Sequence, residues 1–280
     1  MTPLSLVSKA FLAPALTALA LAILPVRAHA LQCGTDGSGF DAWLDGLRAK
    51  AAGQGVSAKA LGAALADVSY DPNVVRLDRS QKSFKLSFEQ FYARRVGPAL
   101  INKGKRLMAA HSGTLDRVEK RFGVPREVLI AIWGLETNYG ADTSGKHSII
   151  RSLATLAYDC RRSEFFTGQL IDALRIVDRG DMSVQQLRGG WAGEIGQTQF
   201  LPTPYVKYAV DFDGDGRRDL VNSIPDILAS TASFLKGHGW QAGGSWEPGS
   251  VNYAVIKDWN RAEVYQRTIS VMASKLAGGG

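Results

Sequence analysis

The chain has 280 residues, of which 45% are hydrophobic and 21% are charged, a composition typical of a packed globular protein and too apolar for disorder. Two cysteines exclude a disulfide-dense scaffold, and four histidines leave little for a zinc site. With 33 Lys and Arg against 26 Asp and Glu, the net charge is +7, which favours an anionic partner without identifying it.

Residues 1–30 are predicted to be a targeting segment. Lys9 precedes an apolar stretch from Ala10 to Pro25, and residues 26–30 end in a small-x-small pattern. This arrangement predicts a secretory signal peptide cut after Ala30. The alternative is an N-terminal membrane anchor, which the two prolines inside the apolar stretch disfavour. A lipid anchor at Cys33 is not expected, because the preceding residues form a poor lipobox.

Export would place the mature chain, residues 31–280, in the periplasm with 31 basic and 26 acidic residues, a net charge of +5. In that oxidising compartment Cys33 and Cys160 can pair. Such a disulfide would close a loop of about 127 residues, for which the chain-entropy account gives roughly 4–5 kcal/mol. Two unpaired buried thiols are the alternative, and we favour the disulfide.

Most of the mature chain is predicted to be helical. Ser57 is expected to cap one helix, Asp71-Pro72 to interrupt the pattern, and Pro98 to open another helix. Val251–Ile256 is the best strand candidate. Neither a repeat nor a linker is evident, so we expect one compact, mainly α unit. Apolar residues recur at helical spacing in four stripes: Phe40, Trp43, Leu44, Leu47 and Ala51; Leu61, Leu65 and Val68; Phe84, Phe88 and Phe91; Phe166, Leu170, Leu174 and Val177.

The most informative segment runs from Val124 to Gly140. Pro125 suits a first helical turn and Gly140 a C-terminal cap. Residues 128–135 are apolar on every side, so this helix is expected to be buried all round. Glu136 then follows as the first ionisable residue in nine positions.

The position of Glu136 has chemical consequences. Burial and the negative end of the helix dipole both disfavour the carboxylate, so both should raise the pKa of Glu136. A carboxyl that stays protonated near neutral pH can act as a general acid. The alternative is a glutamate at a helix end that reaches solvent or pairs with an arginine.

Several motifs in a fixed order resemble those of the lytic murein transglycosylases, specifically the membrane-bound B type. The resemblance covers roughly residues 38 to 275, nearly all of the mature chain. The motifs are the catalytic-glutamate segment Glu136–Gly140, the arginine-pair segment Asp159–Phe166, the cleft segment Trp191–Pro202, the calcium loop Asp211–Asp219, the helix end Gly237–Trp240, and Trp259-Asn260 with Tyr265.

The resemblance implies a mainly α fold with a lysozyme-like catalytic core at roughly 115–245, a helical subdomain largely within 38–114, and an EF-hand-like loop. It implies cleavage of the β-1,4 bond between N-acetylmuramic acid (MurNAc) and N-acetylglucosamine (GlcNAc) in peptidoglycan, without water and with a 1,6-anhydro product. Glu136 would act first as the acid and then as the base. No cofactor would be needed for catalysis.

Further residues receive roles from the same resemblance. Gln199 would bind an N-acetyl group or orient Glu136, unless it is a buried amide satisfied by the backbone. Arg161 and Arg162 would pair with lactyl or stem-peptide carboxylates, unless they form exposed ion pairs with Asp159 or Glu164.

Asn260 and Tyr265 match residues that contact the sugar at the cleavage point. The rings of Tyr139 and Phe200 would contact the apolar faces of pyranoses. The chain departs from the family's pattern at Gly190, where a serine is frequent, so a hydroxyl contact from that position is lost.

Glu194 lies in the cleft segment at a position that need not be acidic in the family. We therefore interpret it as a structural or substrate-facing residue rather than a second catalyst. An ordinary glycosidase needs a second carboxylate about 5–10 Å from the acid. If Glu194 shares the cleft with Glu136, a muramidase-type hydrolase becomes a credible alternative.

Residues 211–219 fit the start of an EF-hand loop, which predicts that the loop binds a calcium ion. Position 12 is Asn222 rather than the usual glutamate, and the resemblance suggests Asp226 as the missing ligand. The alternative is an Asx-rich turn that Arg217 and Arg218 neutralise. The predicted ligands are Asp211, Asp213 and Asp215, with Arg217 through its carbonyl and Asp226 through its carboxylate.

Peptidoglycan strands are the expected partner of a chain that we expect to be monomeric. Dispersed basic residues and predicted export argue against nucleic acid. A third hypothesis, besides transglycosylase and hydrolase, is a wall-binding protein without activity. Because the chain ends soon after Leu276, we expect no C-terminal peptidoglycan-binding module. Targeting would then rest on the cleft or on cell-wall synthesis or envelope-machine proteins.

Overall fold

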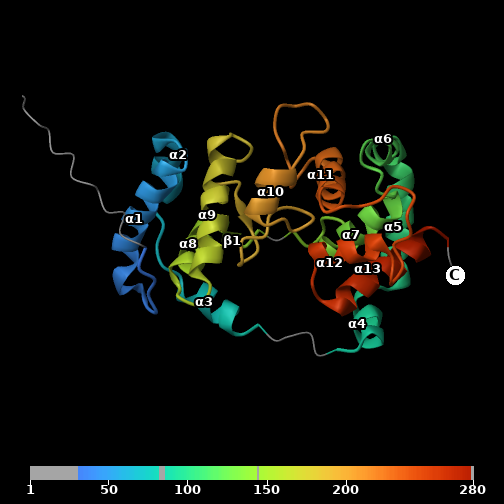
Figure 1. The fold of residues 1–280 in the computed structure, drawn as a ribbon, viewed down its shortest axis with the longest axis horizontal. Helices are drawn as coiled ribbons and strands as arrows, with labels where there is room; N and C mark the ends of the chain where they lie inside the picture. Colours follow the sequence, from blue (N-terminus) through green and yellow to red (C-terminus); the bar gives the residue numbers. More distant parts are fainter. Residues whose placement is uncertain (1–30, 82–85, 144, 279–280) are drawn as a thin grey trace, which may run out of the picture. The chain divides into compact units, whose positions relative to one another are not determined.

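The computed structural model describes residues 31–81, 86–143 and 145–278; the predicted signal peptide and Phe84 lie outside them. The described residues form thirteen α-helices, one 3-10 helix and two short strands (Figure 1). The elements are η1 Gly37–Gly39, α1 Phe40–Gly53, α2 Ala58–Leu65, α3 Pro72–Arg79, α4 Phe88–Arg95, α5 Pro98–Ala110, α6 Ser112–Phe122, α7 Arg126–Thr137, β1 His147–Ser148, α8 Ile149–Tyr158, α9 Ser163–Asp178, β2 Arg188–Gly189, α10 Pro202–Tyr208, α11 Ile224–Gly237, α12 Val251–Trp259 and α13 Glu263–Leu276.

The predicted helix starts are found where the sequence placed them. The side chain of Ser57 accepts a hydrogen bond from the Ala60 amide and caps α2. Pro98 stands in the first turn of α5. Asp71-Pro72, which was expected only to interrupt the helical pattern, caps and opens α3. The stripes of apolar residues on α1 and α9 face the core, as expected.

The predicted strand at Val251–Ile256 is wrong, because these residues begin α12. Ser250 caps the helix by accepting from the Tyr253 amide. The buried side chains, Asn252, Val255 and Ile256, recur at helical spacing. Over six residues the helical and strand periods overlap, so the pattern alone did not separate them.

Helix α7 is the central element of the site-bearing region. All its residues from Val128 to Leu135 are buried, which confirms the expectation of a helix surrounded by protein. Helices α5, α11 and α13 pack against it. Because this helix is fixed on all sides, the residue at its exposed end is held in place by the core.

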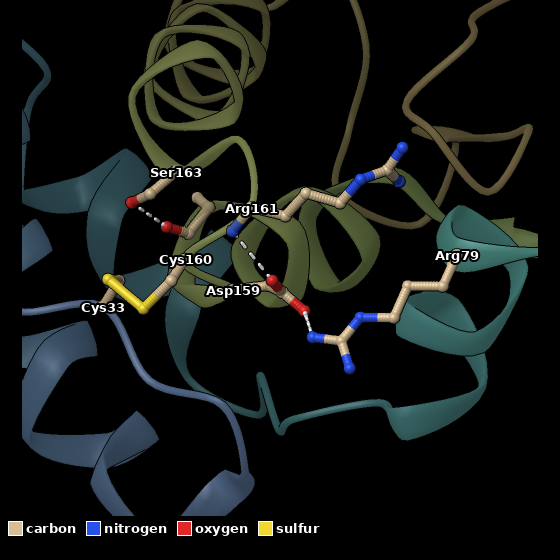
Figure 2. The surroundings of a disulfide bond; sticks show 7 residues. Cys33, Arg79, Asp159, Cys160, Arg161 and Ser163 are labelled. Atoms are coloured by element: carbon tan, nitrogen blue, oxygen red, sulfur yellow. Dashed lines mark hydrogen bonds and ion pairs between the residues drawn. A yellow bond between two sulfur atoms is a disulfide. The ribbon is translucent and has the colours of Figure 1, made fainter.

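Helices α8 and α9 form a second packed pair, which α1, α2 and α3 contact from one side and α10 from another (Figure 1). A disulfide joins Cys33 to Cys160 at the turn between α8 and α9, as the sequence analysis favoured (Figure 2). Beside it, Asp159 accepts hydrogen bonds from the Arg79 guanidinium and the Arg161 amide. The N-terminal segment is therefore bound covalently to the turn that carries the arginine pair.

The described residues from Leu31 onward belong to one compact unit. Within it, the segment 38–114 contributes to two regions, since α1–α3 contact α8 and α9 whereas α4 and α5 contact α13. Across the described ranges, no helix combines the length and apolar character that a bilayer-spanning segment requires.

Candidate active site

A cavity of about 500 Å³ opens beside the end of α7. Its walls come from α7, the α8–α9 turn, the loop before α10, α11 and the end of α12. The lining residues are Gln81, Glu136, Arg162, Phe165, Phe166, Ala192, Glu194, Thr198, Gln199, Phe200, Leu201, Pro204, Phe234, Asp258, Trp259 and Asn260. Segments more than 120 residues apart in the sequence thus meet around one carboxyl, that of Glu136.

Glu136 is placed by the way α7 ends. The helix stops at Thr137, and Asn138 takes the left-handed conformation with φ of 50°. The sequence expectation that Gly140 caps the helix is therefore wrong, since asparagine tolerates this conformation and ends the helix two residues earlier. Glu136 consequently lies in the last turn, where it is partly exposed between two buried neighbours.

The surroundings of Glu136 favour its protonated form. Burial raises the pKa of Glu136, and the negative charge of Glu194 acts in the same direction. Three groups oppose the shift without cancelling it: the indole of Trp259, which donates to Glu136 Oε1 over 2.9 Å, the hydroxyl of Tyr265, and the charge of Arg95. The predicted direction of this pKa shift is confirmed.

Glu194 is a second carboxyl in the same cavity. Its Oε2 accepts from the Ala192 amide over 3.0 Å, and burial raises the pKa of Glu194 as well. The carboxyl folds over Gly190, so closely that a Cβ on that glycine would lie 2.1 Å from Oε2. Glu194 therefore occupies the space that any side chain at position 190 would need.

Two glutamines of the cleft segment have different surroundings. The side-chain amide of Gln197 connects two segments of the protein: it accepts from the Trp133 indole over 2.8 Å and donates to the Val221 carbonyl over 2.7 Å. Gln199 has a left-handed backbone, φ 55°, and lines the cavity while its Nε2 donates to the Gly196 carbonyl. The tight turn thus directs Gln199 toward the cleft.

The arginine pair has a partner that the sequence analysis did not identify. Arg161 and Arg162 both form ion pairs with Asp78 of α3, whose side chain is buried. Arg162 also lines the cavity and lies over the Phe166 ring, with 4.7 Å to its centroid. One of the two positive charges of the pair is therefore balanced within the protein.

The predicted aromatic contacts differ in their surroundings. Tyr139 is buried, its ring packs edge-on against Trp133, and its hydroxyl donates to the Leu100 carbonyl. Phe200 lines the cavity but is only 3% exposed. By contrast Phe165, which the sequence analysis did not single out, lines the cavity and is 48% exposed.

The two residues expected to contact the sugar at the cleavage point have different surroundings. Asn260 lines the cavity, and its Oδ1 accepts from the Ala262 amide. Tyr265 is buried beside Glu136, and its hydroxyl has no well-formed hydrogen bond within the described ranges. Trp259, the neighbour of Asn260, is the direct donor to Glu136, and only the tertiary structure reveals that contact.

The predicted calcium loop brings three carboxylates together. Oxygens of Asp211, Asp213 and Asp226 lie within 4.8 Å of one another. Asp226 is buried and comes from α11, outside the loop itself. Asp215 forms an ion pair with Arg217 and is not part of this group. Three carboxylate oxygens at this separation suit a hard divalent cation such as Ca²⁺.

A mainly helical fold with two glutamic acids, Glu136 and Glu194, in one aromatic-lined cleft is typical of the lysozyme-like class of protein. The sequence matches the family described as "Transglycosylase SLT domain" over residues 39–251. The chain belongs to this family.

Known relatives agree with this assignment. The membrane-bound lytic murein transglycosylase B of Escherichia coli is 36% identical over 149 residues, which are 53% of this chain and 41% of the relative; the match thus spans less than half of that protein. SltB3 of Pseudomonas aeruginosa, solved with NAG-anhNAM-pentapeptide, is 33% identical with a TM-score of 0.80, covering 87% of this chain and 80% of that one.

Slt35 of Escherichia coli, solved in complex with calcium, is 24% identical, has a TM-score of 0.73, and covers 88% of this chain and 96% of its own. This likeness concerns the fold alone. Together the matches confirm the expected mainly α, lysozyme-like fold and the family resemblance seen in the sequence motifs.

Proposed function

We propose that this protein is a peptidoglycan lytic transglycosylase with Glu136 as its acid and base. Glu136 protonates the glycosidic oxygen between MurNAc and GlcNAc, and the bond from that oxygen to C1 breaks. The C6 hydroxyl oxygen of MurNAc then attacks C1, and the carboxylate of Glu136 takes the hydroxyl proton. The reaction consumes no water, and its product carries a 1,6-anhydro ring.

The observation that carries this proposal is the position of Glu136 at the cleft together with the raised pKa of its carboxyl. Its carboxyl reaches the cleft from a rigid helix, and burial raises its pKa, which favours the protonated form that a general acid needs. The Trp259 indole donates to Oε1 and can stabilise the carboxylate formed after donation. One group can therefore serve in both steps.

Other cleft residues fit roles in binding the glycan. The exposed ring of Phe165 offers an apolar face to a pyranose, and the amides of Gln199 and Asn260 can bind acetamido groups. Arg162 lies at the same wall with its charge shared with Asp78. Tyr265 is suited to positioning Glu136 rather than contacting sugar, because it is buried.

A muramidase-type hydrolase is the second candidate, and Glu194 is the observation that favours it. Its carboxyl lines the same cavity as Glu136 and interacts with it electrostatically. Burial raises the pKa of Glu194 and so disfavours the carboxylate that would activate water, and this effect outweighs the hydrogen bond from the Ala192 amide, which lowers the pKa. We therefore prefer the transglycosylase.

Mass spectrometry of purified sacculi digested with the mature chain separates the two reactions. Fragments one water lighter than hydrolytic products are expected from the wild-type chain and not from Glu136→Gln. Free reducing ends that disappear with Glu194→Gln would instead establish hydrolysis. Binding of both proteins to sacculi without any fragments would contradict both enzymatic proposals.

We also propose that Asp211, Asp213 and Asp226 hold a structural calcium ion, with the carbonyl of Arg217 as a further ligand. The ion would offset the repulsion among the carboxylates and tie the loop to the start of α11. Asp215 remains a candidate ligand only if its ion pair with Arg217 opens.

We infer that the protein acts in the periplasm. The predicted signal peptide and the disulfide between Cys33 and Cys160 are consistent with export to an oxidising compartment. Peptidoglycan strands are then the natural partner of the cleft.

A further inference from the structure

A second cavity, of about 660 Å³, shares Glu136 with the cleft as a lining residue. Its lining comes largely from the end of α4, from α5 and from the end of α7. Helix α5 packs against α7 (Figure 1). Four cationic side chains line it, those of Arg94, Arg95, Lys103 and Arg106. Apart from Glu136, the one acidic lining residue in the described ranges is Asp142.

These four cations keep their charge available. None of them forms a salt bridge with a described residue. Arg95 donates to the Leu135 carbonyl, and the Lys103 ammonium donates to the Asn138 carbonyl over 2.8 Å, so both are oriented by neutral main-chain groups. Arg94 and Arg106 are exposed. This arrangement contrasts with Arg161 and Arg162, which both form ion pairs with the buried carboxylate of Asp78.

The charge of a peptidoglycan strand lies off its sugar backbone. The pyranose rings and acetamido groups are neutral, whereas the lactyl arm of each muramic residue ends in a carboxylate or continues into a peptide that carries carboxylates. A substrate seated at Glu136 therefore projects its anionic groups sideways from the glycan. Guanidinium and ammonium groups are the side chains that pair with carboxylates.

We propose that the cavity lined by Arg94, Arg95, Lys103 and Arg106 binds carboxylates on the lactyl arm of a muramic residue, either free or extended by peptide. This inference rests on the proposed function, because it takes the bond cleaved at Glu136 as its point of reference. It assigns the recognition of the charged arm to α4 and α5 rather than to the arginine pair.

The test compares two charge-matched variants. Arg94→Gln/Arg106→Gln removes two charges from the cavity and leaves Arg95 and Lys103, which hold the end of α7. Lys105→Gln/Lys120→Gln removes two charges from exposed positions on α5 and α6 that do not line it. Both are made in the Glu136→Gln background, and their dissociation constants for sacculi are measured without turnover.

The cavity variant is expected to bind about three- to tenfold more weakly than its parent, as for the loss of two partly exposed ion pairs, while the control changes less than about twofold. Sacculi whose carboxyls have been converted to amides should abolish the difference. On amidase-stripped glycan, which carries only lactyl carboxylates, a persisting difference assigns the lactyl group, and a lost difference assigns the peptide.

Equal loss in the two variants, or a difference that survives amidation, would overturn the inference. In chains that retain Glu136, the cavity variant should raise KM and leave kcat unchanged. The proposed reaction fails separately if the wild-type chain forms no anhydro product, because the binding comparison does not depend on turnover.

Discussion

Glu136 takes its chemistry from its position at the point where α7 leaves the core. Seven of the eight residues before it have essentially no solvent exposure, and the chain turns away two residues later at Asn138. Its burial thus favours the protonated form of the carboxyl, which still reaches the cleft. A glutamate one turn earlier would be sealed in the core.

The raised pKa of Glu136 predicts how stability varies with pH. The folded state binds the proton of Glu136 more tightly than the unfolded state, in which the pKa of this carboxyl lies near 4.5. The free energy of unfolding therefore decreases as pH rises from 4.5 through the pKa of the folded state. Glu136→Gln removes this loss. In thermal unfolding, the Tm of the variant relative to the Tm of the wild type should increase with pH through that window and stay constant above it. A difference between the two proteins that is independent of pH would contradict the shift.

Two adjacent glycines predict unequal effects of the same substitution. A Cβ at Gly189 would lie 1.9 Å from the Glu194 carbonyl oxygen, and one at Gly190 would lie 2.1 Å from the Glu194 carboxyl. Backbone cannot yield as a side chain can, so Gly189→Ala should destabilise more, by about 2–4 kcal/mol against about 1 kcal/mol for Gly190→Ala.

Denaturant unfolding with a double-mutant cycle tests this contrast. Glu194→Ala should rescue Gly190→Ala, because it removes the colliding carboxyl, and should leave Gly189→Ala unrescued. Rescue of both substitutions, or of neither, would show that the Glu194 side chain does not fill the space at Gly190.

At the scale of elements, caps and local hydrogen bonds determine where helices begin. Tertiary contacts determine which of their residues are buried and which reach the site. Ser250 starts α12 in a segment that reads equally well as a strand. Asn252 is then buried because its amide bonds the backbone of Gln241 and Gly244. At its end, α12 brings Trp259 to Glu136.

The loop before α11 predicts a calcium-dependent stability. An ion bound only to the folded state stabilises by RT ln(1 + [Ca²⁺]/Kd), about 2.7 kcal/mol at one hundred times Kd. Adding millimolar calcium to chelator-treated protein should raise Tm, and Asp226→Asn should abolish the rise. Asp215→Asn is the matched control, since Asp215 lies outside the three-carboxylate group, and it should keep most of the shift. An unchanged Tm in the wild type would exclude a structural ion.

At the scale of the molecule, the disulfide predicts a large contribution to stability. It joins cysteines 127 positions apart, and the chain-entropy account gives roughly 4–5 kcal/mol for such a loop. Cys33→Ala/Cys160→Ala should lower the free energy of unfolding by up to about that amount in urea titrations. Reduction of the wild type should have a similar effect and leave the double variant unchanged. A loss below about 1 kcal/mol would mean that the loop is already constrained in the unfolded chain.

The sequence motifs predicted much of the candidate site because each motif lies within one short segment of the chain. Glu136 follows directly from an apolar run that ends at a helix terminus, and Asp211 and Asp213 follow from loop spacing. The site's longer-range contacts had weaker signals. Phe165 looked like one more apolar residue of α9, and Arg161 and Arg162 gave no sign that Asp78 would hold them.

The sequence by itself determined the helical class, the family and the glutamate at the end of α7, since periodicity, caps and motif order are properties of neighbouring residues. Only the tertiary structure decided that Trp259 donates to Glu136, that Glu194 occupies the space beside Gly190, and that four cations meet at a second cavity. The physical reason is that desolvation, charge pairing and close approach depend on which distant segments the core brings together.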